Sequence, residues 1–274
     1  MPAPDISSPS NPRIKDVVKL RNRRHRDATG RFIIEGRIEI ERAIGAGIEI
    51  LDLFVDVTRG ASIVGSSDIT TVAPTAFERM AYRQSPDGYL AVARTPRTGL
   101  DDLTTGEDAL ILIVEAVEKP GNLGTMLRTA DATGVAAVIV CDQATDLYGP
   151  NVVRASLGCL FTVPVAIAVS DAAIDWCRRH DVKIVATTPH TDRVYTDVNL
   201  TGRLAIVVGA EHSGLSAAWL EAAAERVRMP MMGGIDSLNA ASTAAVALYE
   251  SLRQRRVLGP NSVPRPQDGP VAPA

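Results

Sequence analysis

The chain has 274 residues, of which 46% are hydrophobic and 22% are charged, and its formal net charge is −3. These values are typical of a globular protein large enough for two modest domains, and the acidic balance excludes a uniformly basic nucleic-acid coat. No segment approaches the roughly 20 apolar residues of a membrane span, and Met1–Pro12 lacks the apolar core of a secretory signal. We therefore expect a cytoplasmic protein with no membrane partner.

Hydrophobic periodicity predicts a small α/β unit over residues 12–96, after a disordered lead over residues 1–11. The predicted elements are a helix over 12–22, a strand over 32–35, a helix over 36–46, a strand over 50–57, a short strand from 71, a helix over 75–83 capped by Thr75, and a strand over 89–93. Residues 97–108 form the predicted linker, because they repeat Thr, Gly and Asp without a helical period.

The first predicted helix opens a strongly basic segment. Between Arg13 and Arg26 there are seven cations and one anion, Asp16, so the local balance is 7 − 1 = +6. Such a segment favours contact with the phosphates of a nucleic acid. From charge alone, a solvated helix face explains it equally well.

Residues 109–258 alternate strands with helices, which predicts an open and mostly parallel sheet. The predicted strands are 109–114, 136–141, 162–166, 183–187, 204–208 and 227–229; the predicted helices are 122–133, 151–159, 172–180, 215–224 and 238–255. The tail over 259–274 is rich in Pro and is expected to be disordered.

The three cysteines, Cys141, Cys159 and Cys177, are odd in number and widely spaced. This pattern fits neither a disulfide framework nor a zinc site. We therefore expect reduced structural thiols and no bound metal.

The segment Glu115–Arg128 follows the first strand of the second unit, and ligands bind beyond the carboxyl ends of strands in such sheets. Asn122 is a natural N-cap for the next helix, while Gly124 and Arg128 share one helix face. The missing side chain at Gly124 predicts room for a phosphate or carboxylate held by the forked donors of Arg128. An ordinary capped helix with a surface arginine is the alternative.

Residues 207–215 make up the second strand end of unusual composition. Gly209 permits close backbone approach by a ligand, Glu211 lies in the turn as a hydrogen-bonding group, and Gly214 is expected to open the next helix. An ordinary strand-to-helix turn with two glycines is the alternative.

Residues 228–241 make up the third such strand end. Pro230 ends the strand, two glycines follow, and Asp236 or Ser237 is expected to cap a helix that starts near Leu238. Small residues dominate the start of that helix, so it can pack closely against a neighbour. A Met-rich loop that fills gaps in the core is the alternative.

Together the three segments resemble the three motifs of the SpoU/TrmH superfamily of RNA 2′-O-ribose methyltransferases, the SPOUT class. The matching residues are Asn122-x-Gly124-x-x-x-Arg128, Gly209-x-Glu211-x-x-Gly214-Leu215, and Met229-Pro230-Met231 through Ser237-Leu238-Asn239, with Ala210 where many members have Asn. Residues 153–158 resemble a further family segment. Residues 32–36 and 89–93 are similar to the substrate-binding domain that precedes many ribosomal RNA enzymes, so the resemblance spans residues 12–256.

The resemblance implies an α/β fold in which a trefoil-knotted, parallel-sheet methyltransferase domain follows a small RNA-binding domain. It also implies the cofactor S-adenosylmethionine, a cofactor site at a homodimer interface, and 2′-O-methylation of a structured RNA. The separate N-terminal domain favours large-subunit (23S) ribosomal RNA over transfer RNA as the partner. A catalytically silent RNA-binding module is a second reading. A nicotinamide-dependent oxidoreductase is disfavoured, because no Gly-x-Gly-x-x-Gly follows a strand.

The resemblance also implies roles for individual residues. The expected catalytic residues are Arg128, Asn122, Glu211, Ser237 and Asn239, and the expected cofactor contacts are Thr187, Thr188, Gly209, Met229 and Leu238. The expected RNA contacts are Arg21, Arg23, Arg24, Arg26 and Arg154. Because an arginine ordinarily keeps its proton up to about pH 12, Arg128 is expected to position the ribose and stabilise charge rather than to act as a base.

Overall fold

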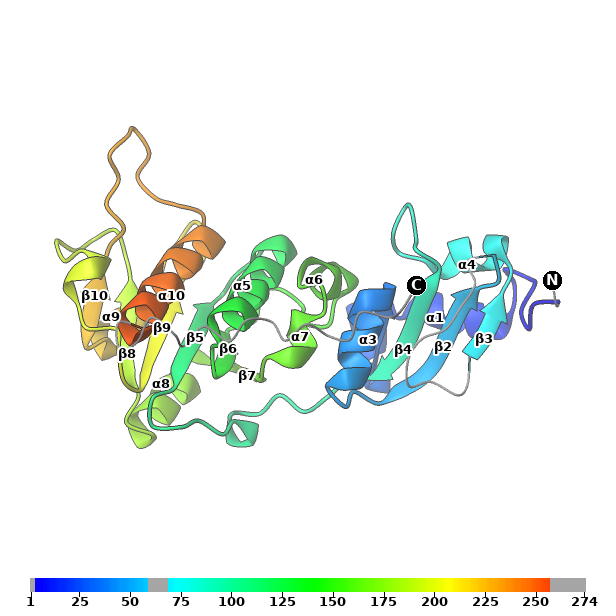
Figure 1. Ribbon diagram of the computed structural model, residues 1–274, viewed down its shortest axis with the longest axis horizontal. Coiled ribbons are helices and arrows are strands. Elements are labelled where there is room, and N and C mark those ends of the chain that lie inside the picture. The colour runs from blue at the N-terminus through cyan, green and yellow to red at the C-terminus, as the bar shows by residue number, and fades with distance from the viewer. Residues whose placement is uncertain (1–2, 59–68, 257–274) are drawn as a thin grey trace.

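Two β-sheets organise the chain, whose computed structural model describes residues 3–58 and 69–256 (Figure 1). The N-terminal unit consists of α1 (Pro12–Lys19), α2 (Arg23–Thr29), β1 (Arg31–Glu35), α3 (Arg37–Gly45), β2 (Ile50–Asp56), β3 (Ile69–Val72), α4 (Pro74–Met80) and β4 (Tyr89–Arg94). Its four strands lie in the order β1-β4-β2-β3, with β4 antiparallel to both neighbours and β3 parallel to β2.

Three features of this unit differ from the sequence prediction. The basic helix is split in two, because the Asn22 side chain accepts a hydrogen bond from the Arg24 amide and starts α2. Thr75 does not cap α4, whose N-cap residue is Ala73. Residues 3–11 are not a disordered lead: Ile6 is buried and forms a parallel bridge with Val72, so this segment extends the sheet.

The C-terminal unit is a six-stranded sheet that follows a short 3₁₀ turn, Leu100–Asp102, in the linker. Its elements are β5 (Leu110–Glu115), α5 (Pro120–Thr133), β6 (Ala137–Cys141), α6 (Pro150–Ala155), α7 (Cys159–Thr162), β7 (Val165–Ala168), α8 (Ser170–Arg179), β8 (Lys183–Thr187), the 3₁₀ turn Tyr195–Asp197, β9 (Leu204–Val208), α9 (Ala217–Ala222), β10 (Glu225–Val227) and α10 (Ala240–Arg256). The strands lie in the order β10-β8-β9-β5-β6-β7 and every neighbouring pair is parallel. The predicted α/β class with a parallel sheet is therefore confirmed.

The helix predicted over 151–159 is two short helices, because Leu157 and Gly158 both adopt left-handed backbone angles, with φ of +51° and +81°. As a result α7 occupies residues 159–162, and the strand predicted over 162–166 lies instead at 165–168. The predicted tail lies outside the described residues. None of the helices in the described ranges is long and apolar enough to cross a membrane.

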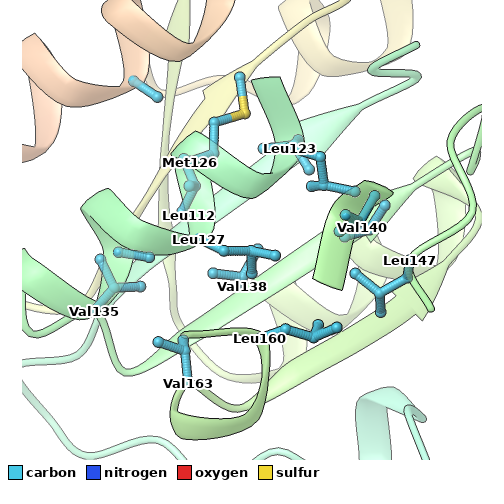
Figure 2. Packing of buried hydrophobic residues seen from close by; sticks show 14 of the residues in the cluster. Leu112, Leu123, Met126, Leu127, Val135, Val138, Val140, Leu147, Leu160 and Val163 are labelled. Atoms are coloured by element: carbon cyan, nitrogen blue, oxygen red, sulfur yellow. The ribbon is translucent and has the colours of Figure 1, made fainter. Parts of the chain in front are cut away.

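Helices cover both faces of the C-terminal sheet. Leu112 and Val114 of β5 pack with Leu123 and Leu127 of α5, in the cluster that Figure 2 shows and that also includes α10. The alternate β5 residues belong to a second cluster with Trp176 of α8 and Trp219 of α9. Burial on both faces explains the continuous apolar run of this strand.

The two units share one hydrophobic cluster across their contact, where α3 lies beside α7 (Figure 1). The Phe32 ring of β1 lies with its centroid 4.9 Å from that of Tyr148 and 5.9 Å from that of Phe161. Arg26 forms a buried ion pair with Asp146 of the C-terminal unit. Apolar packing and a shielded ion pair therefore fix the N-terminal unit against the C-terminal one.

Candidate active site

A pocket of about 210 Å³ opens at the carboxyl ends of β8, β9 and β10. Its lining includes all five residues predicted to bind the cofactor, namely Thr187, Thr188, Gly209, Met229 and Leu238. Glu211 and Ser237, two of the predicted catalytic residues, also line it. Loops distant in sequence therefore meet where ligands bind in open parallel sheets.

Gly209 is required by close packing within this pocket. A Cβ atom at this position would overlap the backbone of Gly214 and Leu215. The Gly214 amide donates to the Ala210 carbonyl at 3.0 Å, which folds residues 210–214 back onto the strand end. The prediction that Gly214 opens the next helix is wrong. Gly214 lies in this turn with φ of +68°, and Ser216 is the N-cap of α9.

The end of β8 is joined to both neighbouring strands. The Thr187 hydroxyl donates to the Val207 carbonyl at 2.9 Å, and the Thr188 amide donates to the Val227 carbonyl at 2.9 Å. The Thr188 hydroxyl accepts from the His190 amide at 3.2 Å. These bonds hold the floor of the pocket in one arrangement.

Three predicted catalytic residues form a chain of hydrogen bonds beside the pocket. The Asn239 amide nitrogen donates to the Asn122 side-chain oxygen at 3.2 Å, and the Asn122 amide nitrogen donates to Glu211 Oε1. The second carboxylate oxygen of Glu211 is buried and has no hydrogen-bond partner within the described part of the chain. It is an acceptor available to a ligand.

Two capping predictions at these residues are wrong. Asn122 is not the N-cap of α5, because the helix begins at Pro120 after Lys119 and the Asn122 side chain is used by Glu211 instead. Neither Asp236 nor Ser237 caps α10: the Asn239 side chain accepts from the Ala241 amide at 2.9 Å.

Arg128 does not line this pocket in its own chain. It is exposed on α5 and lines two other grooves instead. Six residues separate it from Asn122, which places it about 9 Å further along the helix axis and on a different face. The space predicted beside Gly124 is also absent, because a Cβ there would overlap Ala155 and the Ser156 amide of the neighbouring turn. Gly124 therefore serves helix packing.

Of the four N-terminal arginines expected to bind RNA, three make contacts within the chain. Arg26 is 5% exposed, pairs with Asp146 and donates to the Leu20 carbonyl at 2.6 Å, so its predicted role as a surface RNA contact is wrong. Arg21 donates to the Ala81 carbonyl at 2.5 Å, and Arg23 donates to the side chain of Gln143 at 3.3 Å. Neither Arg24 nor Arg154 has an ion pair or side-chain hydrogen bond within residues 3–58 and 69–256, and both are exposed.

A buried carboxylate that no sequence motif indicated holds the start of α9 against the end of β5. Glu115 ends β5 at 5% exposure, and its side chain accepts from the Ser216 amide at 2.8 Å and from the Ser170 hydroxyl at 3.3 Å. Trp219 Nε1 in turn donates to the Ser170 hydroxyl at 2.8 Å. An acidic residue closing an apolar strand was the available signal, because a buried carboxylate needs hydrogen-bond donors.

Thiol and metal chemistry find no support in the described residues. All three cysteines are free and buried. Burial raises the pKa of Cys177 to about 12 and that of Cys141 well above its usual range, so both stay protonated near neutral pH. No group of three or more potential metal-ligating side chains occurs in the described ranges.

Comparisons with known proteins agree with this geometry. The profile of the SpoU rRNA Methylase family matches residues 109–249, and that of the MRM3-like substrate binding domain matches residues 11–91. The 23S rRNA (uridine(2479)-2′-O)-methyltransferase of Streptomyces viridochromogenes is 32% identical over 250 residues, which are 86% of this chain and 87% of that protein. The 23S rRNA (guanosine(2553)-2′-O)-methyltransferase RlmP of Bacillus subtilis is 31% identical over 246 residues, which are 89% of this chain and 97% of that protein.

A solved structure extends the likeness to the fold. The SpoU methyltransferase AviRb from Streptomyces viridochromogenes, crystallised in complex with AdoMet, superposes with a TM-score of 0.82 at 32% identity. The match covers 89% of this chain and 98% of that one. Since the family profile spans the whole six-stranded sheet and the relatives match nearly end to end, the chain belongs to the SpoU rRNA methylase family.

Proposed function

We propose that this protein transfers a methyl group from S-adenosylmethionine to a ribose 2′-hydroxyl of large-subunit ribosomal RNA. The observation that carries the proposal is the pocket at the ends of β8, β9 and β10, which gathers Thr187, Gly209, Glu211, Met229 and Leu238. Two relatives that match over most of this chain are 23S rRNA 2′-O-methyltransferases. A ribosomal RNA substrate would place the protein in the cytoplasm.

Two features of the pocket fit S-adenosylmethionine. Gly209 leaves a cradle that any side chain would fill, so main-chain groups can approach a ligand closely. Glu211 offers a buried oxygen that lacks a donor within the described residues. We assign cofactor binding to the backbone at Thr187, Thr188 and Gly209 and to Met229 and Leu238. When bound, the cofactor supplies an electrophilic methyl group on a sulfonium, which is a good leaving group.

The protein's own task is then to align the ribose hydroxyl and assist loss of its proton. Alignment of the reacting oxygen alone contributes several kcal/mol to such reactions. The exposed guanidinium of Arg128 is suited to hold the hydroxyl and its neighbouring phosphate, because its donors form a fixed fork. Asn122, Glu211 and Asn239 hold the adjacent loops together, and Ser237 lies at the pocket edge.

We further propose a homodimer in which Arg128 of one copy serves the pocket of the other. Arg128 lies outside its own pocket, so a second copy offers a way to complete the site. The loop beside the pocket also exposes apolar side chains, with Met232 at 97% and Ile235 at 62% exposure, which favours a covering partner.

Mixing two inactive variants tests this arrangement. At a limiting cofactor concentration, Arg128→Ala and Gly209→Ala chains should each have little activity, whereas a mixture refolded together should reach about one quarter of the wild-type rate, because half of the dimers then carry one intact composite site. Circular dichroism of each variant checks that it folds. A mixture that stays inactive although sedimentation shows mixed dimers would contradict a shared site.

Exposed cations that have no partner within the described part of the chain support a surface that binds the phosphates of the RNA. Arg24 and Arg154 meet that criterion, whereas Arg21 and Arg23 have partners within the chain. Phosphate contacts of this kind position RNA without reading its sequence.

We also propose that the C-terminal unit contains the trefoil knot expected from the family. The chain would close this knot where α10, which follows β10, packs against α5.

The direct test is transfer of radiolabelled methyl groups to deproteinised 23S and 16S ribosomal RNA and to transfer RNA. Label should enter 23S RNA, and primer-extension stops at low deoxynucleotide concentration should locate one nucleotide. Label confined to transfer RNA would overturn the substrate assignment. A protein that binds RNA but shows no calorimetric response to S-adenosylmethionine would overturn the enzymatic one.

A further inference from the structure

A groove between the two units lies beside Arg128 and is separate from the cofactor pocket. Glu39 and Arg83 of the N-terminal unit form one wall, and Arg128, Asn151, Arg154 and Leu157 contribute to the other. Its volume of about 570 Å³ is within the range of about 300–1,000 Å³ found for ligand sites. The groove is therefore large enough for a molecular ligand.

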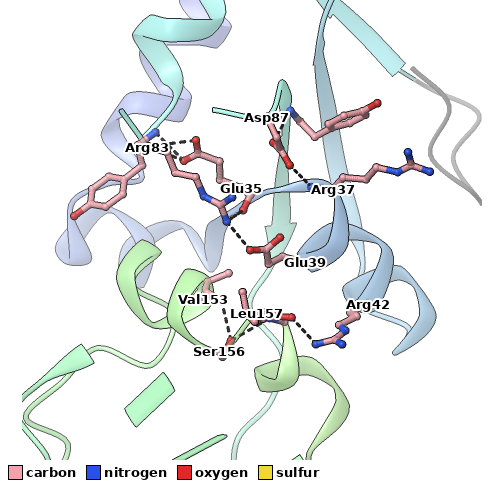
Figure 3. Close-up of polar contacts among 12 residues, drawn as sticks. Glu35, Arg37, Glu39, Arg42, Arg83, Asp87, Val153, Ser156 and Leu157 are labelled. Atoms are coloured by element: carbon pink, nitrogen blue, oxygen red, sulfur yellow. Dashed lines mark hydrogen bonds and ion pairs between the residues drawn. The ribbon is translucent and has the colours of Figure 1, made fainter. Parts of the chain in front are cut away.

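The charge of this groove favours an anion. Three arginines and one glutamate line it, for a balance of 3 − 1 = +2. The glutamate is buried and already paired, since Arg83 donates to Glu39 at 2.5 Å (Figure 3). Arg128 and Arg154 have no ion pair within the described ranges, so both remain available to phosphates.

Leu157 is the unusual residue of the groove. Its backbone is left-handed, with φ of +51°, which costs a residue with a branched apolar side chain about 1–2 kcal/mol. The residue is nevertheless 43% exposed and lines both of the grooves that Arg128 lines. Neither core packing nor an easy backbone explains a leucine at this position.

The N-terminal unit holds this strained turn in place. Arg42 donates to the Leu157 carbonyl at 2.7 Å, as Figure 3 shows. The Ser156 hydroxyl donates to the Val153 carbonyl at 2.8 Å and accepts from the Gly158 amide at 3.3 Å. A Cβ added at Gly158 would meet Arg42 within 3.1 Å, so α3 packs directly against the turn. The turn is thus braced from both units.

We propose that Leu157 contacts an unstacked base of the substrate RNA, next to the target ribose, while Arg128 and Arg154 hold the phosphates on either side. The inference rests on the proposed RNA methyltransferase function. Strained backbone persists where the surroundings fix it and is concentrated at functional sites. Apolar side chains that wedge against a base help to separate it from its neighbours, and RNA is read chiefly through such splayed, single-stranded bases.

The test uses the strain itself. Leu157→Gly and Leu157→Asn both suit a left-handed backbone, so each variant should unfold at a midpoint close to that of the wild type. Each should nevertheless lower kcat/KM for 23S RNA about tenfold, because the apolar contact with the base is lost. The affinity for S-adenosylmethionine, measured by calorimetry, should not change.

Asp181→Gly is the matched control. Asp181 is also exposed with φ of +51°, but it follows α8 and lies in neither groove. This substitution should leave kcat/KM unchanged. A second probe is an RNA fragment with an abasic site at each position flanking the target in turn: one such position should weaken wild-type binding and leave Leu157→Gly binding unchanged.

Two results would overturn the inference while leaving the methyltransferase function intact. One is an active enzyme whose kcat/KM is the same for wild type and both Leu157 variants. The other is a Leu157→Gly chain that loses its dimer in sedimentation while its RNA affinity is kept, which would make the residue a subunit contact. Absence of any methyl transfer by the wild type would instead overturn the proposed function.

Discussion

The side-chain amide of Asn122 donates a hydrogen bond to Glu211, a residue 89 positions later in the chain. This contact joins the first turn of α5 to the loop that follows β9. Asn239 adds the loop before α10 by donating to the Asn122 oxygen at 3.2 Å. One neutral amide therefore ties together the three segments that carry the family motifs.

Replacing Asn122 by Asp should show the importance of that amide. Asn122→Asp places two carboxylates in contact, whereas Asn122→Ala removes the donor to Glu211 and the acceptor for Asn239 without adding a charge. The Asp variant should therefore lose more activity although it is closer in shape. Methylation rates of the wild type and the two variants at neutral pH measure this, and equal losses in the two variants would contradict it.

Arg128→Ala should separate binding from chemistry. Because Arg128 lies outside the cofactor pocket of its chain, the affinity for S-adenosylmethionine should change less than about twofold, while the methylation rate falls at least about 100-fold through loss of transition-state stabilisation. Calorimetry and single-turnover kinetics provide the two values. Arg179→Ala, an exposed arginine on α8, is the control and should keep the full rate. An undiminished rate in Arg128→Ala would remove the residue from the mechanism.

Gly209→Ala should close the cofactor pocket. The new methyl group would overlap the backbone of Gly214 and Leu215, so the loop must move, with a loss of about 1–3 kcal/mol in the free energy of unfolding and at least about tenfold in cofactor affinity. Gly233→Ala is matched, because the same methyl group meets nothing within 4 Å there. If both variants bind the cofactor equally well, the pocket is misplaced.

Asp146→Asn should weaken the contact between the two units. The Arg26 guanidinium is 6% exposed and would lose its charged partner, while the side-chain oxygen that accepts from the Tyr148 amide is kept. The free energy of unfolding should fall by about 2 kcal/mol. Asp175→Asn, whose pair with Arg178 is two-thirds exposed on both sides, should change it by less than about 0.5 kcal/mol. Urea unfolding that ranks the two variants equally would argue against a structural role for Arg26.

Glu35 should make the free energy of unfolding decrease as pH rises, which is opposite to the usual effect of a carboxyl group in a folded protein. Burial, partly offset by hydrogen bonds from the Tyr82 and Arg83 amides, raises the pKa of this carboxyl above 4.5. The folded protein therefore binds this proton more tightly than the unfolded chain, and the contribution of Glu35 to stability falls as pH rises from 4.5 through the folded pKa. Relative to Glu35→Gln, the wild type should gain stability as pH is lowered from 7 to 4.5.

Glu250 supplies the opposite control. Hydrogen bonds from Arg253 and Gln254 hold the pKa of Glu250 below its usual value. The contribution of Glu250 to the free energy of unfolding is therefore complete above pH 4.5 and is lost as pH falls through the folded pKa. Denaturation of wild type, Glu35→Gln and Glu250→Gln at several pH values compares the two. Differences that move in the same direction with pH would contradict the assignment for Glu35.

The sequence by itself determined the order of strands and helices along the chain, the parallel sheet and part of the pocket at the strand ends. Continuous apolar runs such as residues 110–114 record burial on both faces, and that signal is local. Part of the pocket was predictable because parallel strands end at one edge of a sheet, so the unusual residues after the strands that end at 208 and 227 were expected to lie close together. Thr187 and Thr188 were indicated only by the family resemblance, and the segment after the first strand of the sheet does not line the pocket.

Only the tertiary structure decided which partner each polar side chain takes. Asn122 serves Glu211 rather than a helix end, Gly124 admits a neighbouring turn rather than a ligand, and Arg26 is buried against Asp146 rather than exposed to RNA. Periodicity reports how strongly a position is buried, but it carries no information about contacts between residues about 30 to 120 positions apart, which depend on how the two units and the helices pack. The same packing placed Arg128 beside a groove between the units and outside its own cofactor pocket.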